Sequence, residues 1–268
     1  MNKVDKKFNF LIPIKTKDLI RLGANYDGGY VVNKSIVEKA NILVSFGIGN
    51  DWSFELDFLK KNKKGTVNIY DHTTNIFPYI KNLLKSLRRT LTLRANIQNL
   101  FNNFNALKSY ILFKYNKNIQ VYFERVVSKK IFKYDADLQK VFNRLNEKEK
   151  KIILKIDIEG YEYQIVPHLF NVKKEILMIV VEYHDIEKNI LKFKKQILEL
   201  KKKYNIIHIH GNNHANINKF GFPNVLEITL LKKNKINKKN KLKLNFPIKK
   251  YDFPNNKNIE DIKFCFEN

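Results

Sequence analysis

The sequence has a single cysteine, Cys265, among its 268 residues. One cysteine excludes an internal disulfide and a cysteine-rich zinc site, and it indicates a reducing compartment. Long apolar runs are missing too. No uncharged stretch approaches the roughly 18 residues of a membrane-spanning helix, and the apolar run near the N-terminus is too short for a signal peptide. We therefore expect a soluble, cytoplasmic protein without a transmembrane segment.

Acidic residues are scarce: 26 Asp and Glu face 51 Lys and Arg, which gives a formal net charge of +25. Such a balance favours an acidic partner, namely nucleic acid, a phosphate-bearing substrate or an anionic membrane. The alternative is that the lysines are solvated and serve no dedicated polyanion-binding groove, since the chain as a whole is rich in Lys, Asn and Ile. Because no aromatic–basic motif of a known RNA-binding module is present, no nucleic-acid partner is expected.

Apolar runs predict seven strands. With 44% hydrophobic residues, the chain can bury one substantial core, so residues 1–268 are expected to form one domain. No internal repeat is present. Apolar residues recur with helical spacing in four segments: from about Phe54 onward, over 135–150, after Gly160 and over 187–203. In the helix after Gly160, Tyr161, Ile165 and Leu169 are expected to face the sheet. The last strand follows without a helix, which predicts an antiparallel neighbour. The fold class is therefore α/β, a doubly wound, Rossmann-like, seven-stranded and mostly parallel sheet, with strands at 42–46, 65–73, 118–128, 152–156, 175–185, 204–216 and 225–231.

Two segments lie outside this alternation. Residues 76–117 have the leucine and phenylalanine spacing of two helices, and we interpret them as a helical insertion. It could be a lid, a dimer arm that makes a homo-oligomer, a phosphate-facing wall or a solvated basic face. Residues 232–268 form a basic C-terminal extension, in which 232–250 are expected to be a mobile loop and 251–268 to dock back or fray. In the helical insertion at 76–117, the polar face carries six basic residues, Lys81, Lys85, Arg88, Arg89, Arg94 and Lys108.

The strand at 152–156 ends in a group of carboxylates. Asp157 and Glu159 follow it directly, and Gly160 ends the segment. Open α/β sheets bind ligands just beyond the carboxyl ends of their strands. A carboxylate placed there loses hydration energy unless it finds a partner, so this edge of the sheet is the predicted site.

The strand at 42–46 is followed by Gly47 and Gly49, and Asp51 or Ser53 is placed to cap the next helix. A strand, a glycine turn and a helix N-terminus let backbone amides approach a ligand closely. Asp71, with His72 after it, ends the following strand 22 positions beyond Gly49 and is placed to accept hydrogen bonds from ribose hydroxyls. This combination favours an adenosine-containing cofactor. Trp52 stands where a dinucleotide fingerprint needs a third glycine, which disfavours a nicotinamide oxidoreductase.

Polar residues mark further strand ends. Asp27-Gly28-Gly29 predicts a turn before an extended run that starts at Tyr30. Glu124 lies near the end of the third strand. The fifth strand ends in Glu182 and His184, and the sixth ends in His210, Asn212 and Asn213.

These motifs together resemble FkbM-type methyltransferases: LVSFGIGNDWSFE, IYDHT, ILKIDIEGYEYQIVPHL, VVEYHD and IHIHGNN. The resemblance runs in order over residues 21–231, and it is to the branch with an N-terminal DGGYVV segment that is associated with bacterial surface polysaccharide such as capsule. K-I-D-I-E-G-x-E is its most specific part. FGIGNDWSFE replaces the family's more usual glycine-rich motif, and residues 76–117 and the tail lie outside the resemblance.

The resemblance implies a class I enzyme that transfers a methyl group from S-adenosyl-L-methionine to an oxygen of a small, sugar-like acceptor. A basic insertion favours a phosphorylated or nucleotide-linked sugar. Gly47 and Gly49 would approach the cofactor, Asp71 and His72 would hold its ribose end, Glu124 would border the adenine, and Asp157 would lie near the methionine end. The expected substrate-binding residues are Asp27, Tyr30, Glu182, Asn212 and Asn213.

A hydroxyl acceptor needs a base, and histidine is the natural candidate because its ordinary pKa lies near neutrality. We expect His210 or His184 to be the base, with Asp157, Glu182 and Asn212 orienting the acceptor. The same acids and histidines are suitable ligands for a divalent ion, although no tight spacing such as H-x-x-x-H supports a metal site. The alternative functions are a nucleic-acid methyltransferase and a nucleotide-binding module without turnover.

Overall fold

The computed structural model describes residues 1–92, 94, 96–233, 240–241 and 245–267. Its centre is a seven-stranded sheet in the order β12-β13-β11-β10-β5-β6-β7. Strand β13 runs antiparallel to β11 and β12, and the other neighbouring pairs are parallel. This confirms the predicted fold class. The strands are β5 (Ile42–Phe46), β6 (Thr66–Tyr70), β7 (Ile119–Tyr122), β10 (Lys151–Ile156), β11 (Glu175–Tyr183), β12 (Tyr204–Gly211) and β13 (Leu226–Lys232).

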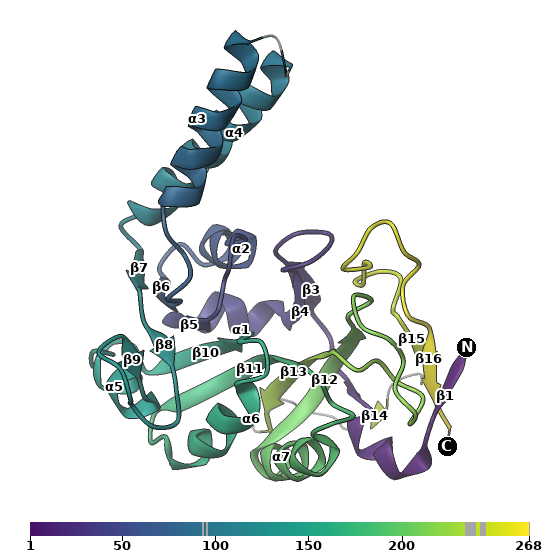
Figure 1. Ribbon diagram of the computed structural model, residues 1–268. Helices are drawn as coiled ribbons and strands as arrows, with labels where there is room; N and C mark the ends of the chain where they lie inside the picture. Colours follow the sequence, from purple (N-terminus) through teal and green to yellow (C-terminus); the bar gives the residue numbers. More distant parts are fainter. Residues whose placement is uncertain (93, 95, 234–239, 242–244, 268) are drawn as a thin grey trace.

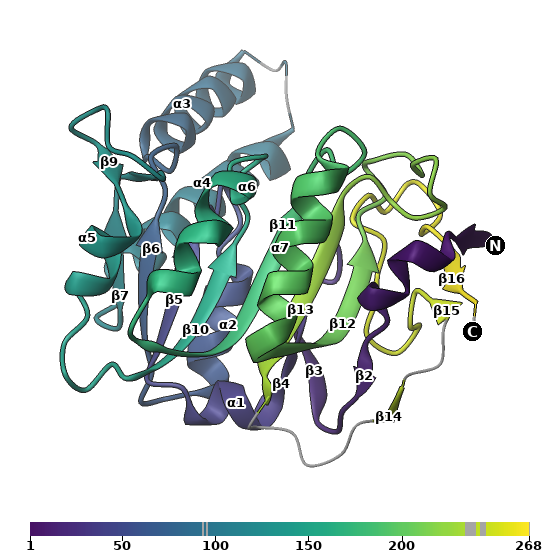
Figure 2. The ribbon, with the colours of Figure 1, turned by 90° about the horizontal axis from the view of Figure 1, so that it is seen from below.

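Both faces of the sheet are covered, because successive side chains of its strands point to opposite faces. In β5, Ile42, Val44 and Phe46 belong to one hydrophobic cluster, whereas Leu43 belongs to the other. The first cluster is completed by residues of α5 (Leu138–Asn143), α6 (Glu162–Ile165), the 3-10 helix η2 (Val166–Asn171) and α7 (Ile190–Lys203). The second is completed by residues of α1 (Lys34–Lys39) and α2 (Ser53–Lys61). Figure 2 shows α7 in front of the sheet and α1 and α2 behind it.

The predicted turn at Asp27-Gly28-Gly29 is found between β3 (Leu19–Leu22) and β4 (Tyr30–Asn33), which pair antiparallel. This hairpin packs on the α2 side of the sheet. Tyr30 contacts Phe54 edge to face at 5.6 Å between ring centroids, and Thr229 Oγ1 of β13 donates a hydrogen bond of 2.6 Å to the Val31 carbonyl. The hairpin therefore brings Asp27 and Tyr30 to the edge of the sheet where β10 ends.

Residues 76–117 contain the two expected helices, α3 (Phe77–Leu91) and α4 (Ile97–Lys114). They run side by side as an arm that projects from the body of the protein (Figure 1). The arm is joined to the body through aromatic rings. Trp52 stacks on Phe113 with ring centroids 4.8 Å apart, and it also contacts Tyr110 at 5.8 Å and Tyr79 at 6.0 Å. Trp52 thus holds the arm.

Two expectations about local structure are wrong. The helix predicted over 135–150 is confined to α5, because Asp135 instead ends a turn. Its carboxylate accepts the amides of Ile131 and Phe132 at 2.9 and 2.8 Å and pairs with Arg125 at 3.1 Å. The predicted third strand is also divided into β7 and a short β8 (Arg125–Val126), which pairs with β9 (Asp135–Ala136).

Tyr161 was predicted to face the sheet with Ile165 and Leu169, but only the latter two are buried. Tyr161 is 39% exposed. It lies before the first turn of α6, where the chain is still turning after Glu159 and Gly160, which both have positive φ angles. The ring therefore points away from the core, toward the cavity described below.

The two ends of the chain pair with each other. β1 (Asn2–Val4) runs parallel to β16 (Phe264–Phe266), which pairs antiparallel with β15 (Asn245–Phe246). Phe246 and Phe264 are almost fully buried, so residues 251–267 dock back. The remaining elements are η1 (Lys6–Leu11), β2 (Ile14–Lys15) and β14 (Asn240–Lys241). Much of the predicted mobile loop, 234–239 and 242–244, lies outside the described residues. Among the helices that are described, none has the length and apolarity needed to cross a membrane.

Candidate functional site

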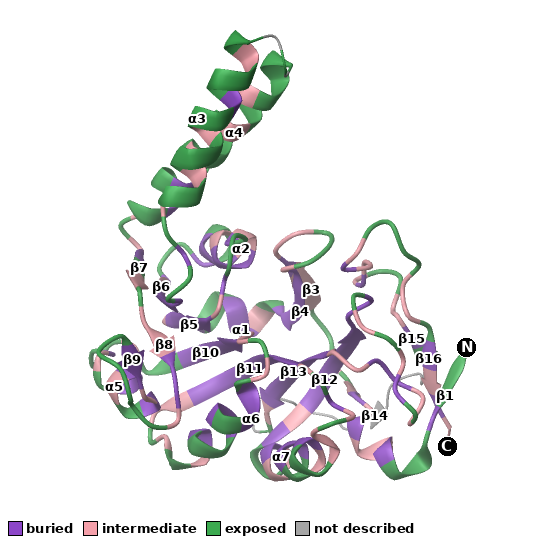
Figure 3. Ribbon diagram, viewed as in Figure 1, coloured by how far each residue is buried: buried purple, intermediate pink, exposed green. Residues whose placement is uncertain are grey.

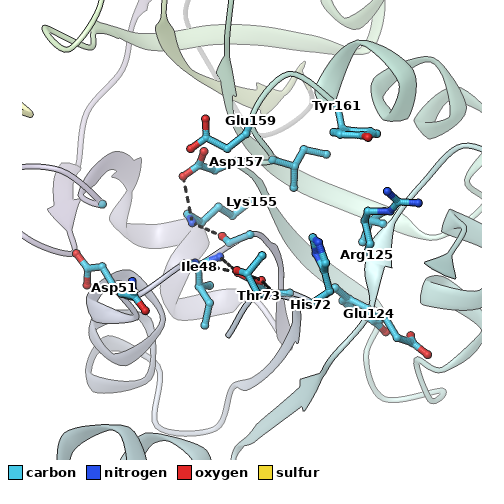
Figure 4. A pocket seen from close by; sticks show the side chains of 18 of the residues that line it. Ile48, Asp51, His72, Thr73, Glu124, Arg125, Lys155, Asp157, Glu159 and Tyr161 are labelled. Atoms are coloured by element: carbon cyan, nitrogen blue, oxygen red, sulfur yellow. Dashed lines mark hydrogen bonds and ion pairs between the residues drawn. The ribbon is translucent and has the colours of Figure 1, made fainter. Parts of the chain in front are cut away.

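A cavity of about 650 Å³ lies at the carboxyl ends of β5, β6 and β10. Its size falls in the range of small-molecule sites. Seven of the residues predicted from the sequence line it, from five separate segments: Asp27, Gly47, Gly49, Asp71, His72, Glu124 and Asp157. Figure 4 shows Asp157 and Glu159 facing the loop of Ile48 and Asp51, with His72, Arg125 and Tyr161 on another side. The carboxyl ends of neighbouring parallel strands lie at the same edge of the sheet, so motifs that are far apart in the sequence meet here.

The glycine loop after β5 has no room for a side chain at Gly47. Its φ angle is +74°, and a Cβ atom built there would lie 1.8 Å from the Asp157 carbonyl oxygen. Gly49 also has a positive φ angle, +52°, but a Cβ atom there would meet nothing within 4 Å. Gly47 is therefore needed for packing against the end of β10, while Gly49 leaves open space beside the cavity.

Asp71 organises this loop from the neighbouring strand. Its Oδ2 accepts the amides of Ile48 and Gly49 at 2.9 and 2.8 Å, and its Oδ1 accepts the amide and hydroxyl of Thr73 at 2.7 and 2.6 Å. Burial raises the pKa of Asp71, but these hydrogen bonds outweigh it and lower the pKa below the ordinary value. A carboxylate offers about four acceptor positions. Supporting the loop is a role that sequence reasoning missed, and contact with a ribose stays a prediction.

Lys155 was also missed, although a lysine within the apolar run IILKI was a usable signal. Its side chain is 3% exposed. Nζ donates to the Gly47 carbonyl at 2.8 Å and lies 3.9 Å from Asp157 Oδ2 and 4.0 Å from Glu55 Oε1. A buried ammonium group needs such partners. Lys155 therefore links the glycine loop to the acid at the end of β10.

Behind Asp157 lies a buried network. The hydroxyl of Tyr30 is 2.9 Å from Asp157 Oδ2 and 3.0 Å from Glu182 Oε2, and Asn212 Nδ2 donates to Glu182 Oε1 at 2.8 Å. A phenol has only one proton to donate. Both contacts of Tyr30 can therefore be hydrogen bonds only if one carboxyl group is protonated. Burial, and then the charges of Asp157 and Glu227, raise the pKa of Glu182 well above its ordinary value, which favours Glu182 as the protonated group.

His184 lies beside this network, with a side chain 16% exposed. Its Nδ1 is 3.2 Å from Glu162 Oε1, and its Nε2 is 3.7 Å from Glu182 Oε1 and 3.6 Å from Glu159 Oε2. Burial lowers the pKa of His184, but the hydrogen bond to Glu162 and the charge of Glu162 outweigh it and raise the pKa to about 9. An imidazolium has no lone pair to accept a proton. Near pH 7 the geometry favours charge compensation over the expected role of base.

His210 does not reach the cavity, contrary to the expectation that it faces the cleft. The residue is 1% exposed, and its Nδ1 and Nε2 lie 3.2 and 3.1 Å from Glu227 Oε2 and Asp261 Oδ2. Burial lowers its pKa, but the charge of Glu227 and the contact with Asp261 raise it well above the ordinary value. Glu227 accepts a hydrogen bond from Asn255 at 2.8 Å, which also donates to Asp27 at 3.2 Å. His210 thus touches the cavity only through intermediates.

The predicted substrate residues are therefore distributed over three places. Asp27 lines the cavity, whereas Tyr30, Glu182 and Asn212 form the network behind Asp157. Asn213 holds the C-terminal segment: its Nδ2 donates to the carbonyls of Asn256 and Ile259, both at 3.0 Å, and its Oδ1 accepts the Asn256 amide at 2.6 Å. Because Asn213 is buried and its amide group is occupied in this way, it does not reach a substrate in the cavity.

Glu124 lines the cavity, but its carboxylate is neutralised. Lys140 Nζ donates to it at 2.7 Å, and Arg144 binds both oxygens at 2.6 and 3.0 Å. The hydrogen bond from Arg144 is the main cause that lowers the pKa of Glu124. The side chain is thereby fixed at the mouth of the cavity.

A set of flat groups lies next to it, and of its members only His72 was predicted from the sequence. The rings of His72 and Tyr134 are nearly parallel, 7° apart, with centroids 6.1 Å apart. The Arg125 guanidinium lies 5.7 Å from the ring centroids of both Tyr134 and Tyr161. Planar groups of this kind can stack on a nucleobase.

Three side chains could hold a metal ion. One ligand atom each from Asp157, Glu182 and His184 lie within 4.8 Å of one another. The donor set of two carboxylates and an imidazole suits a divalent ion, and the surplus of buried negative charge around Glu182 fits a cation. His210, the fourth predicted ligand, is held by Glu227 and Asp261 and does not belong to the set. Metal binding would require the neutral imidazole of His184 and would release its proton.

The sequence matches no protein-family model and no curated protein. Three of the solved structures that are similar to this chain have 11–12% identity to it. The fibrillarin pre-rRNA processing protein of Methanococcus jannaschii has a TM-score of 0.39 over 73% of this chain and 68% of that one. Precorrin-6y C5,15-methyltransferase from Geobacter metallireducens has 0.34 over 74% and 88%, and an rRNA methylase from Streptococcus thermophilus has 0.36 over 74% and 93%. The fold assignment rests on the strand order above, because these similarities are too weak to carry an argument about activity.

Proposed function

We propose that this protein is an S-adenosyl-L-methionine-dependent methyltransferase of the FkbM type that acts on a hydroxyl of a small, sugar-like acceptor in surface-polysaccharide biosynthesis. One observation carries the proposal. The glycine loop, Asp71, Glu124 and Asp157, which the sequence resemblance assigns to the cofactor, converge on one cavity of about 650 Å³ at the carboxyl edge of the sheet.

The chain's own groups suit the parts of such a cofactor. The planar groups around His72 and Tyr134 would stack on its adenine, beside Glu124. The loop at Gly49, held by Asp71, would approach its ribose, and Asp157 and Glu159 would attract its positively charged amino and sulfonium groups. The bound cofactor supplies an electrophilic methyl group, and the cavity orients the acceptor oxygen and excludes water.

The acceptor hydroxyl must lose its proton as the new bond forms. Asp157 is the base that the geometry supports best, because it lines the cavity and is 27% exposed at its side chain. Tyr30 holds Asp157 by a hydrogen bond of 2.9 Å. The imidazolium of His184 offsets the charge of the neighbouring carboxylates. His210 is a positioning residue in this scheme.

The buried network was described above with one carboxyl group protonated. The alternative is that Asp157, Glu182 and His184 bind a divalent cation in place of that proton. Such an ion would lower the pKa of a bound hydroxyl and orient it. Chelation distinguishes the two cases. Loss of activity after dialysis against EDTA, restored by Mg²⁺ or Mn²⁺, supports the ion, and full activity after chelation supports the proton.

The cavity favours a hydroxyl-rich acceptor without a phosphate inside it. Its lining contains the acids Asp27, Asp51, Asp157 and Glu159 against the cations Lys155 and Arg125, and none of the lysines or arginines of α3 and α4. Acidic walls repel phosphates. This observation argues against the nucleic-acid methyltransferase suggested by the net charge, and it limits a nucleotide-linked sugar to a pose with its phosphates outside.

The test is a thermal-shift screen with S-adenosylhomocysteine, neutral sugars, phosphosugars and nucleotide sugars. A ligand at 100 times its Kd stabilises the folded state by about 2.7 kcal/mol, so cofactor binding should be visible. Isotope transfer from labelled cofactor to a stabilising sugar would then establish turnover. Binding without product from any acceptor would instead indicate a non-catalytic module, and RNA binding at moderate salt would revive the nucleic-acid alternative.

A further inference from the structure

The arm leaves a row of large apolar side chains in water. On α3, Phe77, Ile80, Leu84, Leu87 and Leu91 are between 37 and 76% exposed. On α4, Ile97, Phe101, Phe104 and Ile111 are between 38 and 58% exposed. Figure 3 shows the arm as mostly exposed, in contrast to the buried sheet. We call these nine side chains the arm face.

The arm face is separate from the contact between α3 and α4. We infer that this contact uses Tyr79, Leu83 and Ser86 on α3, because they are buried or half-buried and Tyr79 stacks on Tyr110 of α4. The exposed α3 residues follow each other at intervals of three and four and therefore form one stripe. At about 100° per residue, this stripe lies roughly a third of a turn from the Tyr79–Leu83–Ser86 row. A helix with two apolar rows at such an angle is typical of a bundle of more than two helices.

The stripe on α4 points to the same side of the arm. Its inner row is Leu100, Leu107 and Tyr110, half-buried or buried, and the exposed α4 stripe is displaced from this row by the same angle in the same sense. Because the two helices are antiparallel (Figure 1), equal displacements bring the two stripes onto one side. The arm face is therefore one continuous surface made by both helices.

Most charges of the arm lie elsewhere. Residues 76–117 contain no Asp or Glu, and on α3 Lys81, Lys85 and Arg89 lie on the side opposite to the arm face and the α4 contact. A helix that binds a membrane surface carries its basic residues where they can reach the headgroups. Here Lys81, Lys85 and Arg89 would point away, and the cations near the arm face are Arg88, which borders Leu84 and Leu91, and Lys108 within the α4 stripe. The distribution favours an apolar partner over an anionic membrane.

The size and symmetry of the arm face fit a second copy of this chain. Nine side chains that each bury on the order of 100 Å² would remove roughly 900 Å² per copy, against about 800 Å² per partner in a standard interface. Two identical two-helix arms, joined face to face about a twofold axis, complete a four-helix bundle. The side of each arm with Lys81, Lys85 and Arg89 then stays outside the contact, and Arg88 and Lys108 lie at it.

We propose that residues 77–114 are a dimerisation arm, whose arm face pairs with the same face of a second copy in a four-helix bundle. The contacts of Trp52 with Phe113, Tyr110 and Tyr79 fix the arm to the body in this exposed position. The inference does not depend on the proposed methyl transfer.

Sedimentation velocity of the full chain tests it. One copy has a mass of 31.9 kDa, and the expected species at micromolar concentration is twice that. Leu84→Glu together with Phe101→Glu places two charges in each arm face and should give the monomer, with at least a tenfold weaker association. Both residues are exposed in the single copy, so circular dichroism and the melting temperature at low concentration should stay close to those of the unchanged protein.

The matched control is Asn102→Glu with Ser109→Glu, two exposed α4 residues on the side away from the arm face. It adds the same charge and should remain a dimer. A wild-type monomer at 100 µM, or a dimer unaffected by the Leu84 and Phe101 changes, would overturn the proposal. So would a monomer that co-sediments with phosphatidylglycerol vesicles through the arm face, because the partner would then be a membrane.

Discussion

The sheet edge and the arm are opposites in how they treat polar and apolar groups. At the edge, Asp71, Lys155 and Glu182 are buried and each has a hydrogen-bond partner within the chain. In the arm, apolar side chains such as Leu84 and Phe101 are more than half exposed. The buried polar groups of the edge therefore find their partners within one copy of the chain. The arm, in contrast, exposes apolar side chains that a second protein surface could bury. Five predictions test this contrast.

The largest effect is expected at the edge, from Asp157→Asn. Loss of a general base lowers kcat by about 10²–10⁴-fold, whereas an amide of the same shape keeps the fold. Single-turnover methyl transfer, together with calorimetric binding of S-adenosylhomocysteine, separates chemistry from cofactor affinity. The exposed acid Asp18, changed to Asn, is the control and should keep full activity. Retained turnover in Asp157→Asn would remove this residue as the base.

His210→Ala tests the buried part of the edge through stability. It leaves Glu227 and Asp261 without their cation, and breaking a buried ion pair costs about 3–5 kcal/mol. Urea unfolding should show this loss. In His210→Gln, which keeps a hydrogen-bonding group, any folded protein should retain most of its turnover, because His210 does not line the cavity. A turnover loss as large as that of Asp157→Asn would make His210 part of the chemistry.

The same residue predicts a pH dependence. The folded-state pKa of His210 is raised well above the unfolded value of about 6.5. Its contribution to stability is therefore fully present below pH of about 6.5 and is lost as the pH rises through the folded-state pKa. The melting temperature should fall on the alkaline side, and His210→Gln should flatten that fall. An unchanged pH profile in the variant would contradict the buried imidazolium.

Asp71→Asn has a smaller expected effect. The amide replaces one acceptor oxygen by a donor that faces the amides of the glycine loop or Thr73, at a cost of about 1–3 kcal/mol. Thermal unfolding measures this cost, and cofactor titration should show weaker binding because the loop is loosened. Glu147→Gln, at an acid with a 92% exposed side chain, is the control for removal of one charge.

The smallest effect is expected from the arm on the edge. Leu84→Glu with Phe101→Glu should change the Kd for S-adenosylhomocysteine by less than about twofold, because no residue of α3 or α4 lines the cavity. Isothermal titration of monomer and dimer provides the comparison. A tenfold change would show that the two regions are coupled, through the contact of Tyr79 with Asn50 or through Trp52.

Much of the fold was accessible from local pattern. Runs such as Ile42–Phe46 and Glu175–Tyr183 are apolar on both faces, as buried parallel strands require, and the missing helix before Leu226 predicted an antiparallel strand. The helix expected over 135–150 failed because the hydrogen bonds of Asp135 to Ile131 and Phe132 compete with helix formation. Such a competition depends on Arg125, ten residues away, and is invisible in the periodicity.

The site was accessible only in part. The rule that strand ends share an edge brought Gly47, Asp71 and Asp157 together correctly as lining residues. It could not rank the histidines, because their roles depend on the carboxylates around each ring. Nor could it find Lys155 and Tyr134. The lysine is hidden in an apolar run. The tyrosine stacks on His72, which lines the cavity, and lies in a loop to which the sequence pattern gave no role.

By itself the sequence determined the order of strands and helices and the edge at which polar residues collect, because alternation and apolar runs are local properties of the chain. Only the tertiary structure decided which carboxylate is free, which histidine is charged and which side of the arm is uncovered. Those properties depend on which segments, far apart in the sequence, lie close together in the fold. Burial and neighbouring charges shift the pKa of a group according to these distances.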